Sequence, residues 1–165
     1  MIKVICNASP VIGLIGIGKL NLLWELFDEV VIPKAVLQEL YAGNRKPESS
    51  QIKEAIENSR IKVIEIRGSD TAYLLHGKLH RGELETIIGA KEDTDIRFAI
   101  IDEKAARKFA AAMFVDTLGI IGILSYAKSR GKIEAVRPYM DQLIQNNYRI
   151  SDVLYSQVLK NENEL

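Results

Sequence analysis

Hydrophobic and polar positions along this chain follow two patterns, one typical of strands and one typical of helices, and segments of the two kinds alternate. Short apolar runs rich in valine and isoleucine are typical of strands, whereas longer segments with apolar residues three and four positions apart are typical of helices. Strands are expected at residues 2–6, 29–32, 61–66, 97–101 and 114–115. Helices are expected at residues 9–27 with a break near 16–19, from 33 or 34 to 42, and at 51–58, 71–79, 82–91, 103–113, 118–129, 134–145 and 151–160. The polar stretch 43–50 predicts a loop.

The order of these elements predicts a fold class. Strands that alternate with helices form an α/β fold, in which a mostly parallel central sheet carries helices on both faces as a three-layer α/β/α sandwich. The 165 residues suit one domain with a sizeable core, whereas two domains would be cramped. Ligand sites in such sheets gather beyond the carboxyl ends of the strands, so candidate chemistry is sought where the predicted strands end.

Composition narrows the picture only a little. Lys plus Arg and Asp plus Glu number 22 each, so the net charge gives no sign of nucleic-acid binding, although a local basic rim is compatible with it. Cys6 is the single cysteine, which excludes an intramolecular disulfide and a cysteine metal cluster. The most apolar segment, 11–26, is interrupted by glycines and polar residues, so no membrane span is expected. The chain start lacks the pattern of a secretory signal, and a cytoplasmic location is expected.

Four side chains with oxygen ligands stand where the predicted fold could bring them together. Asn7 follows the first strand and Asp102 follows the fourth, so parallel pairing would place both at one edge of the sheet. Glu83 begins a helix and shares a face with apolar side chains, and Glu39 lies on the side of its helix that carries Ala35. Converging oxygen ligands suit Mg²⁺ or Mn²⁺. Such an ion lowers the pKa of bound water and stabilises charge on a phosphate, as phosphodiester hydrolysis requires.

Each of these side chains also has a purely structural interpretation. Asp102 could cap the helix that follows it, because Asp is a favoured N-cap residue. Glu83 is stabilised by the positive end of its helix, and Glu39 is typical of an acid at the border of an amphipathic helix. A capping role is less expected for Asn7, since the Ser-Pro pair at 9–10 already supplies a cap and a first helical residue.

Several short motifs, in their order and spacing, resemble a prokaryotic, toxin-like (VapC-type) branch of the PIN-domain family. The motifs are Asn7-Ala8-Ser9-Pro10, Gly18-Lys19-Leu20-Asn21-Leu22-Leu23, Val31-Ile32-Pro33 leading to Glu39, Gly82-Glu83-Leu84-Glu85-Thr86-Ile87, Ile100-Ile101-Asp102-Glu103 running into Ala105-Ala106-Arg107, and Thr117-Leu118-Gly119-Ile120. With the later helices, the resemblance covers nearly the whole chain, and it implies one PIN-like domain over residues 1–165. It implies Asn7, Glu39, Glu83 and Asp102 as ligands of Mg²⁺ or Mn²⁺, with Glu39, Glu83 and Asp102 as catalytic acids.

The same resemblance implies an activity and partners. It implies a metal-dependent endoribonuclease that cleaves single-stranded RNA, as the toxin of a toxin–antitoxin pair held inactive by a small antitoxin protein. Family habit also favours a homodimer.

Two residues depart from the family pattern. The family usually has aspartate where this chain has Asn7, and an amide can coordinate a cation but brings no charge and cannot act as a base. Related chains commonly carry a small residue where this chain has Asp116, which follows the brief strand expected at 114–115 and could bring a further carboxylate to the metal. The departure at Asn7 leaves an alternative open, in which a catalytically weakened PIN-like fold acts as an RNA- or protein-binding module.

Two further patterns complete the sequence-based expectations. Basic side chains near the four candidates could contact phosphates, although solvated helix faces explain them equally well: Arg45, Lys46, Lys78, His80, Arg81, Lys104, Arg107 and Lys108. The glycine-rich segment 13–19 has the spacing of a phosphate-binding loop, but Leu20 stands where that motif needs Ser or Thr. Nucleotide binding is therefore not expected there.

Overall fold

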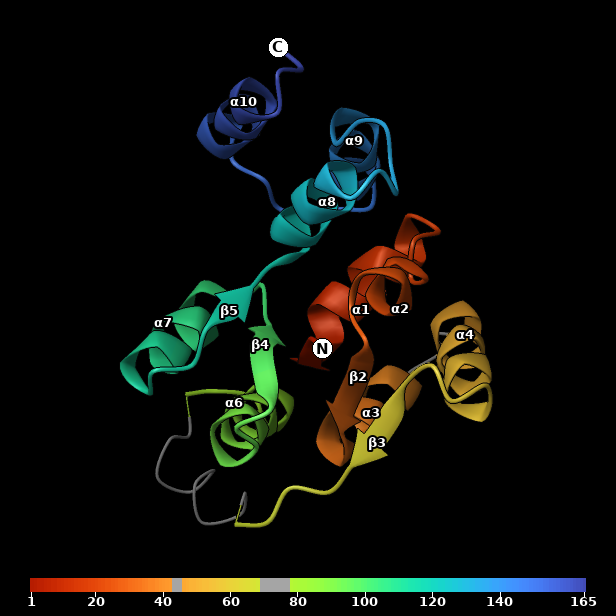
Figure 1. Ribbon diagram of the computed structural model, residues 1–165, viewed down its shortest axis with the longest axis vertical. Helices are drawn as coiled ribbons and strands as arrows, with labels where there is room; N and C mark the ends of the chain where they lie inside the picture. Colours follow the sequence, from red (N-terminus) through yellow and green to blue (C-terminus); the bar gives the residue numbers. More distant parts are fainter. Residues whose placement is uncertain (43–45, 69–77) are drawn as a thin grey trace.

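In a computed structural model, the chain is described at residues 1–42, 46–68 and 78–165. These residues form a five-stranded sheet of order β3-β2-β1-β4-β5, and every neighbouring pair of strands is parallel (Figure 1). The strands are β1 (Lys3–Cys6), β2 (Glu29–Pro33), β3 (Lys62–Ile64), β4 (Ile96–Ile100) and β5 (Thr117–Leu118). The helices among the described residues are α1 (Ala8–Gly16), α2 (Leu22–Leu26), α3 (Lys34–Tyr41), α4 (Lys46–Glu57), α6 (Arg81–Glu92), α7 (Lys104–Ala112), α8 (Ile120–Ser129), α9 (Arg137–Gln145) and α10 (Asp152–Asn161).

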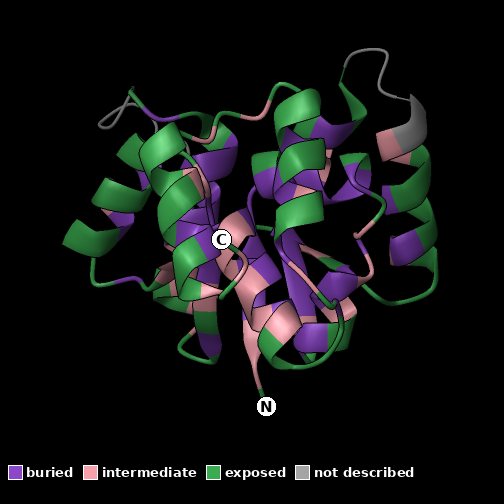
Figure 2. Cartoon of the chain, turned by 90° about the horizontal axis from the view of Figure 1, so that it is seen from above, coloured by how far each residue is buried: buried purple, intermediate pink, exposed green. Residues whose placement is uncertain are grey.

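The side chains of β1 show how the sheet becomes the middle layer. Val4 and Cys6 point to one face and pack with α1, α2, α8 and α9, whereas Ile5 points to the other face and packs with α6 and α7. This alternation is the period-two geometry of a strand buried on both faces. Each large aliphatic side chain buried in this way contributes about 1.5–3 kcal/mol. Burial is concentrated between the layers in Figure 2, which confirms the predicted α/β/α sandwich.

A clasp near the end of the chain fixes the start of α9. The Glu164 carboxylate accepts hydrogen bonds at 2.9 Å from the backbone N–H groups of Val136 and Arg137. Lys128 of α8 donates to the same carboxylate at 2.9 Å. Burial raises the pKa of Glu164, but the two amides and the Lys128 ammonium outweigh it and hold that pKa below its ordinary value. The clasp therefore joins α8, α9 and the C-terminal segment.

Helix α1 begins earlier than the sequence pattern predicts. Its N-cap is Asn7, with the helix starting at Ala8, so the Ser-Pro pair at 9–10 lies inside the first turn and does not begin the helix. The backbone N–H of Asn7 donates to the carbonyl of Ile100 in β4 at 3.0 Å, which holds Asn7 at the end of β1 beside β4. Proline is tolerated in a first turn because the N–H groups there have no partner within the helix.

Three other sequence-based expectations need correction or fall outside the description. Residues from 46 onward are helical in α4, not loop. The fifth strand is 117–118 instead of 114–115, because Phe114 adopts a left-handed conformation (φ 60°) that ends α7. Most of the helix expected at 71–79 lies outside the described residues. Within the described ranges, no helix is long and apolar enough to cross a membrane.

The glycine-rich segment 13–19 is no phosphate-binding loop. Gly13 and Gly16 lie within α1, where they allow close packing: a Cβ on Gly13 would come within 2.8 Å of Ile120, and one on Gly16 within 3.1 Å of Asn146. Gly18 follows the helix with a left-handed φ of +67°, a conformation that glycine adopts without strain. The three glycines thus have structural explanations.

Candidate active site

The sheet brings two of the predicted residues to one edge. Asn7 directly follows β1 and Asp102 lies two positions beyond β4, and these strands are paired neighbours. Helices α3 and α6 pack against each other and supply Glu39 and Glu83. A Cβ built on Gly82 would collide with the carboxylate of Glu39, so that carboxylate lies directly against the first turn of α6. The topology therefore gathers all four candidates in one region.

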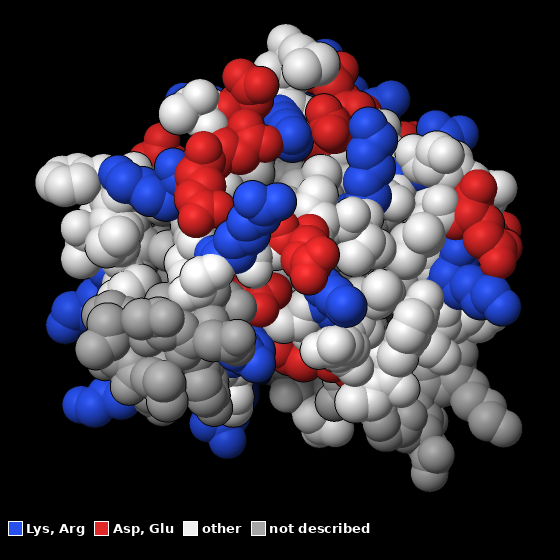
Figure 3. Space-filling model, turned by 90° about the horizontal axis from the view of Figure 1, so that it is seen from below, with Lys and Arg blue, Asp and Glu red and all other residues white. Residues whose placement is uncertain are grey.

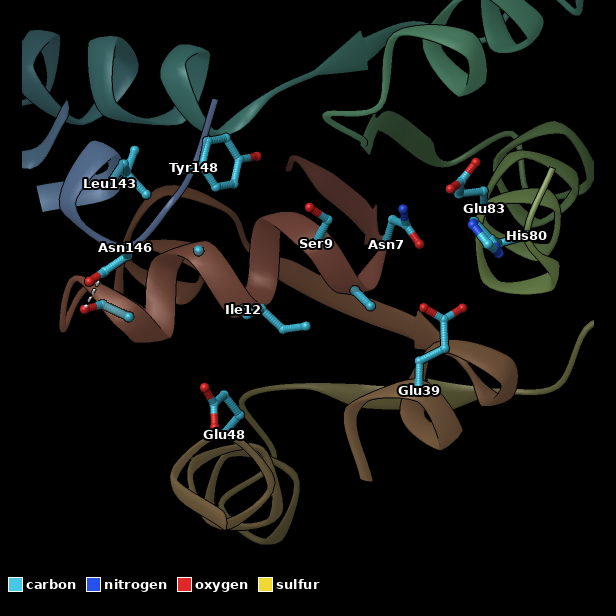
Figure 4. A pocket seen from close by; sticks show the side chains of 13 residues that line it. Asn7, Ser9, Ile12, Glu39, Glu48, His80, Glu83, Leu143, Asn146 and Tyr148 are labelled. Atoms are coloured by element: carbon cyan, nitrogen blue, oxygen red, sulfur yellow. Dashed lines mark hydrogen bonds between the residues drawn. The ribbon is translucent and has the colours of Figure 1, made fainter. Parts of the chain in front are cut away.

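Two adjoining cavities contain these side chains. A cavity of about 580 Å³ is lined by Asn7, Glu39 and Glu83, and also by His80 and Tyr148. A second cavity of about 400 Å³ is lined by residues that include Asn7, Glu83 and Asp102. In Figure 4, Asn7 after β1, Glu39 of α3, and both His80 and Glu83 at the start of α6 point into the same space. Because Asn7, Glu83 and Tyr148 line both cavities, the two form one continuous candidate site.

Asn7 carries an unmet hydrogen-bonding capacity. Its side chain is 4% exposed, and it makes no side-chain cap hydrogen bond to α1 although it occupies the N-cap position. Its Oδ1 is buried without a hydrogen-bond partner among the described residues. Leaving an acceptor unpaired costs about 1–3 kcal/mol, so the position favours a ligand that brings a hydrogen-bond donor or a cation.

Asp102 does not cap the helix that follows it. The N-cap of α7 is Glu103, whose carboxylate accepts from the N–H of Ala105 at 3.4 Å. Instead, Oδ1 of Asp102 accepts from the N–H of Ile120, the first residue of α8, at 2.7 Å. Oδ2 accepts from the hydroxyl of Tyr148. Asp102 therefore joins the end of β4 to α8 and to the α9–α10 connection.

The surroundings of Asp102 leave little free space. Burial raises the pKa of Asp102 to about 6, although the Ile120 amide and the Arg107 guanidinium both act to lower it. A Cβ on Gly119 would lie 2.9 Å from both Oδ1 of Asp102 and a guanidinium nitrogen of Arg107. A side chain at residue 119 would therefore press on both the carboxylate and the guanidinium, whereas glycine leaves them room.

Two buried glutamates on α6 have different surroundings. Glu83 and Glu85 are each 7% exposed. Burial raises the pKa of Glu83; His80 opposes this, whereas the negative charges of Glu103 and Glu39 add to it. Glu85 accepts from the N–H of Ala35 in the first turn of α3 at 3.4 Å and so caps that helix. Glu85 therefore has a structural role, whereas Glu83 faces the cavities.

Asp116 does not lie at this site. The sequence-based expectation placed it after a strand, but it precedes β5, so it stands at the amino ends of the parallel strands, away from Asn7 and Asp102. Its exposed carboxylate pairs with Arg97 at 3.0 Å and lines a separate cavity. The misplaced fifth strand is the reason for this error.

Other residues at the site had no recognised signal in the sequence. The α9–α10 connection contributes Asn146 and Tyr148 to the larger cavity and Asn147, Tyr148 and Arg149 to the smaller one. Glu48 of α4 lines the larger cavity as well. The polar run 146–149 between two helices was the available signal, but such runs are also ordinary loops. Only the tertiary structure shows that this run covers the site.

Some of the basic residues predicted near the acids lie at the site, and others do not. His80 lines the larger cavity and Arg107 lies beside Asp102, while Arg81 pairs with Glu85 at 4.0 Å. Lys78, Lys104 and Lys108 are exposed, and the side chains of Arg45 and Lys46 lie outside the described residues. Acidic and basic side chains are intermixed on the face in Figure 3, without a large area of one sign. The site has local basic neighbours but no broad basic surface in that view.

The donor set fits a hard divalent cation. Carboxylate and amide oxygens are the preferred ligands of Mg²⁺ and Mn²⁺, and the unpaired Oδ1 of Asn7 is such an oxygen. In the described part of the chain, no three His, Cys, Asp or Glu side chains stand close enough together to hold a metal ion as arranged. Glu39 is exposed, so it can rotate toward Asn7 and Glu83. Metal binding would thus draw on the amide of Asn7 and on movement of side chains.

Comparison with known proteins gives one match. Residues 3–164 match the family model DUF3368, a PIN domain. Neither a curated protein nor a solved structure matches the chain. PIN domains are generally nucleases that depend on divalent metal ions, which agrees with the oxygen-rich site. Because the match covers nearly every residue, this chain belongs to the PIN-domain family.

Proposed function

We propose that this protein is an endoribonuclease that cleaves single-stranded RNA with Mg²⁺ or Mn²⁺ bound by Asn7, Glu39, Glu83 and Asp102. The observation that carries the proposal is the buried, unpaired Oδ1 of Asn7, which shares the two cavities with Glu39, Glu83 and the half-buried Asp102. When bound, the metal ion would lower the pKa of a water molecule and stabilise negative charge on the phosphate. Membership of the PIN family supports the nuclease chemistry.

The side chains of the site have different roles in this proposal. Asn7 offers a neutral oxygen, so the charge that attracts a cation comes from the carboxylates of Glu39, Glu83 and Asp102. Burial raises the pKa of Glu83 and of Asp102, and a bound cation would oppose this rise because it favours the charged carboxylate. Arg107 lies near Asp102 and offers positive charge to a phosphate, and His80 lines the same cavity as Glu83, where its ring N–H can donate a hydrogen bond.

The depth of the site supports a single-stranded substrate. Asn7 and Glu83 are 4% and 7% exposed, so a scissile phosphate must enter the cavity to reach them. A single strand can bend into such a cavity and splay its bases, whereas a duplex is recognised mostly from its surface. RNA is favoured over DNA only by the resemblance to toxin-like PIN ribonucleases. A small antitoxin partner and a homodimer belong to the same proposal.

A cleavage assay on the purified protein, freed from any partner, tests the activity. Wild type should cut single-stranded RNA with Mg²⁺ or Mn²⁺ and lose this activity in chelator. Asp102→Asn should abolish cleavage, although asparagine keeps an oxygen for the Ile120 amide. Asp116→Asn is the matched control, because it makes the same change to an exposed acid at the opposite edge of the sheet. Wild-type cleavage no faster than that of Asp102→Asn would refute the enzyme proposal.

Asn7 favours a second candidate function, a weakened PIN fold that binds RNA or a protein. The amide replaces a carboxylate, and no ready-made cluster of three acids exists among the described side chains. Asn7→Asp separates the two functions. If the site is weakened, this variant should bind Mn²⁺ more tightly and cleave RNA that the wild type leaves intact. If the wild type is a full nuclease, both should cleave.

A further inference from the structure

The hydroxyl of Tyr148 donates a hydrogen bond to Oδ2 of Asp102. We propose that Tyr148 is a positioning residue, which holds the Asp102 carboxylate in the orientation that binds the divalent cation. This inference rests on the proposed function. It adds to the metal site a residue from the α9–α10 connection, far in sequence from the four acid and amide ligands.

The end of α9 determines where Tyr148 lies. Asn147 adopts a left-handed conformation (φ 67°), its N–H donates to the carbonyl of Ile144 at 3.0 Å, and the N–H of Tyr148 donates to that of Leu143 at 2.9 Å. These two bonds and the left-handed residue form a Schellman motif, which reverses the chain directly after a helix. Asparagine is the residue other than glycine that most readily takes this conformation. Local backbone geometry therefore directs Tyr148 back over α1.

This turn packs on the face of α1 that carries Gly13 and Gly16. A Cβ on Gly13 would lie 3.3 Å from Cε2 of Tyr148, so the ring packs close to the helix backbone. Three residues later, the carbonyl of Gly16 accepts from Nδ2 of Asn146 at 3.1 Å (Figure 4). Residues three apart share a helix face, so both contacts dock the turn on one surface. The ring is thus held by packing and backbone contacts that do not involve its hydroxyl.

Asp102 is restrained from two sides. Oδ1 accepts from Ile120 N–H at 2.7 Å and Oδ2 accepts from Tyr148. Each carboxylate oxygen has two lone pairs, so both oxygens keep one free for a cation. Without the Tyr148 hydroxyl, a single hydrogen bond would remain, and the carboxylate could turn away from Asn7. Loss of such an outer partner typically weakens metal affinity 10–100-fold.

The test is direct binding of Mn²⁺ to the protein in the absence of RNA, measured by calorimetry. Tyr148→Phe removes the hydroxyl and keeps the ring, and we expect a Kd about 10–100-fold above that of wild type. Tyr155→Phe is the matched control: the Tyr155 hydroxyl also donates to an aspartate, Asp141, at 2.6 Å, but neither residue lines the two cavities. This control should bind Mn²⁺ as wild type does.

A double-mutant cycle with Asp102→Asn separates positioning from a general structural effect. If Tyr148 acts through the Asp102 carboxylate, adding Tyr148→Phe to Asp102→Asn should weaken Mn²⁺ binding no further. An equal loss in both backgrounds, or wild-type affinity in Tyr148→Phe alone, would overturn the inference and leave the proposed function standing. Absence of Mn²⁺ binding in wild type would overturn both.

Discussion

Gly82→Ala is expected to weaken metal binding and cleavage while it leaves the stability of the fold nearly unchanged. Gly82 is the second residue of α6. A Cβ there would come closer to Oε1 of Glu39, by more than about 1 Å, than the 3.4 Å at which ordinary van der Waals contact begins. It would also lie 3.1 Å from Cδ of Glu39 and 3.3 Å from Val36. Glu39 is exposed, so its carboxylate should move while the helix stays in place.

The two effects of this substitution have different sizes. Alanine stabilises a helix by about 0.5–1 kcal/mol relative to glycine. Forcing Glu39 away from its preferred rotamer costs about 0.5–1.5 kcal/mol. The net change in unfolding free energy should therefore stay within about 1 kcal/mol, or about 3 °C in Tm for a chain of this size. In contrast, misplacing a catalytic group by about 1 Å can reduce the rate about 100-fold.

Metal affinity, cleavage rate and Tm can be measured on one preparation, by Mn²⁺ calorimetry, RNA cleavage and thermal unfolding. Gly89→Ala is the control on the same helix, because its Cβ would come within 2.6 Å of Ile5 in the hydrophobic core and 3.0 Å of the half-buried Ile66. Overpacking of this kind costs about 1–3 kcal/mol, so Gly89→Ala should lower Tm and keep Mn²⁺ affinity. Wild-type affinity and cleavage in Gly82→Ala would refute the expectation that the metal site needs the Glu39 carboxylate in its place beside Gly82.

The remaining predictions concern the C-terminal clasp and the surroundings of Asp102. Glu164→Gln should lower the unfolding free energy by about 1–2 kcal/mol in urea titrations, because Val136 and Arg137 donate to different carboxylate oxygens and glutamine replaces one of these oxygens by an NH2 group that cannot accept. Since the folded-state pKa of Glu164 is lowered, its stabilisation is complete above the ordinary glutamate pKa and is lost as the pH falls through the lowered value. The stability difference between wild type and Glu164→Gln should accordingly shrink in acid, and a constant difference would contradict this. Gly119→Ala should weaken Mn²⁺ binding at least about tenfold, because its Cβ would press on Oδ1 of Asp102; unchanged affinity would show that Asp102 adjusts freely.

The sequence predicted the fold class because the signals for it are local. Fully apolar runs predict buried parallel strands, and the segments between them have helical spacing. The last helix was expected to start at residue 151, and the Ser151 hydroxyl is its N-cap, accepting from the N–H of Leu154 at 3.1 Å. The positions of Asn7 and Asp102 at neighbouring strand ends follow from the same alternation.

Details set by tertiary contacts were beyond local patterns. The Ser-Pro pair at 9–10 is a good helix start, but Asn7 bonds to Ile100 of β4 through its backbone N–H and α1 begins directly after it, at Ala8. The fifth strand is two residues long and is defined by its pairing with β4. Tyr148 reaches Asp102 only because α9 docks on the glycines of α1. Composition and periodicity carry no information about these contacts.

The central place of β1 also bears on the order in which the molecule can assemble. β1 is made first, and its partner β2 follows soon after, but its other partner β4 begins only at Ile96. Until then one edge of β1 is unpaired, and the N–H of Asn7 lacks the Ile100 carbonyl that receives it. Pairings this distant along the chain form slowly, because a long loop must close first. On the ribosome, the first ligand candidate to emerge would therefore be among the last parts of the site to be fixed.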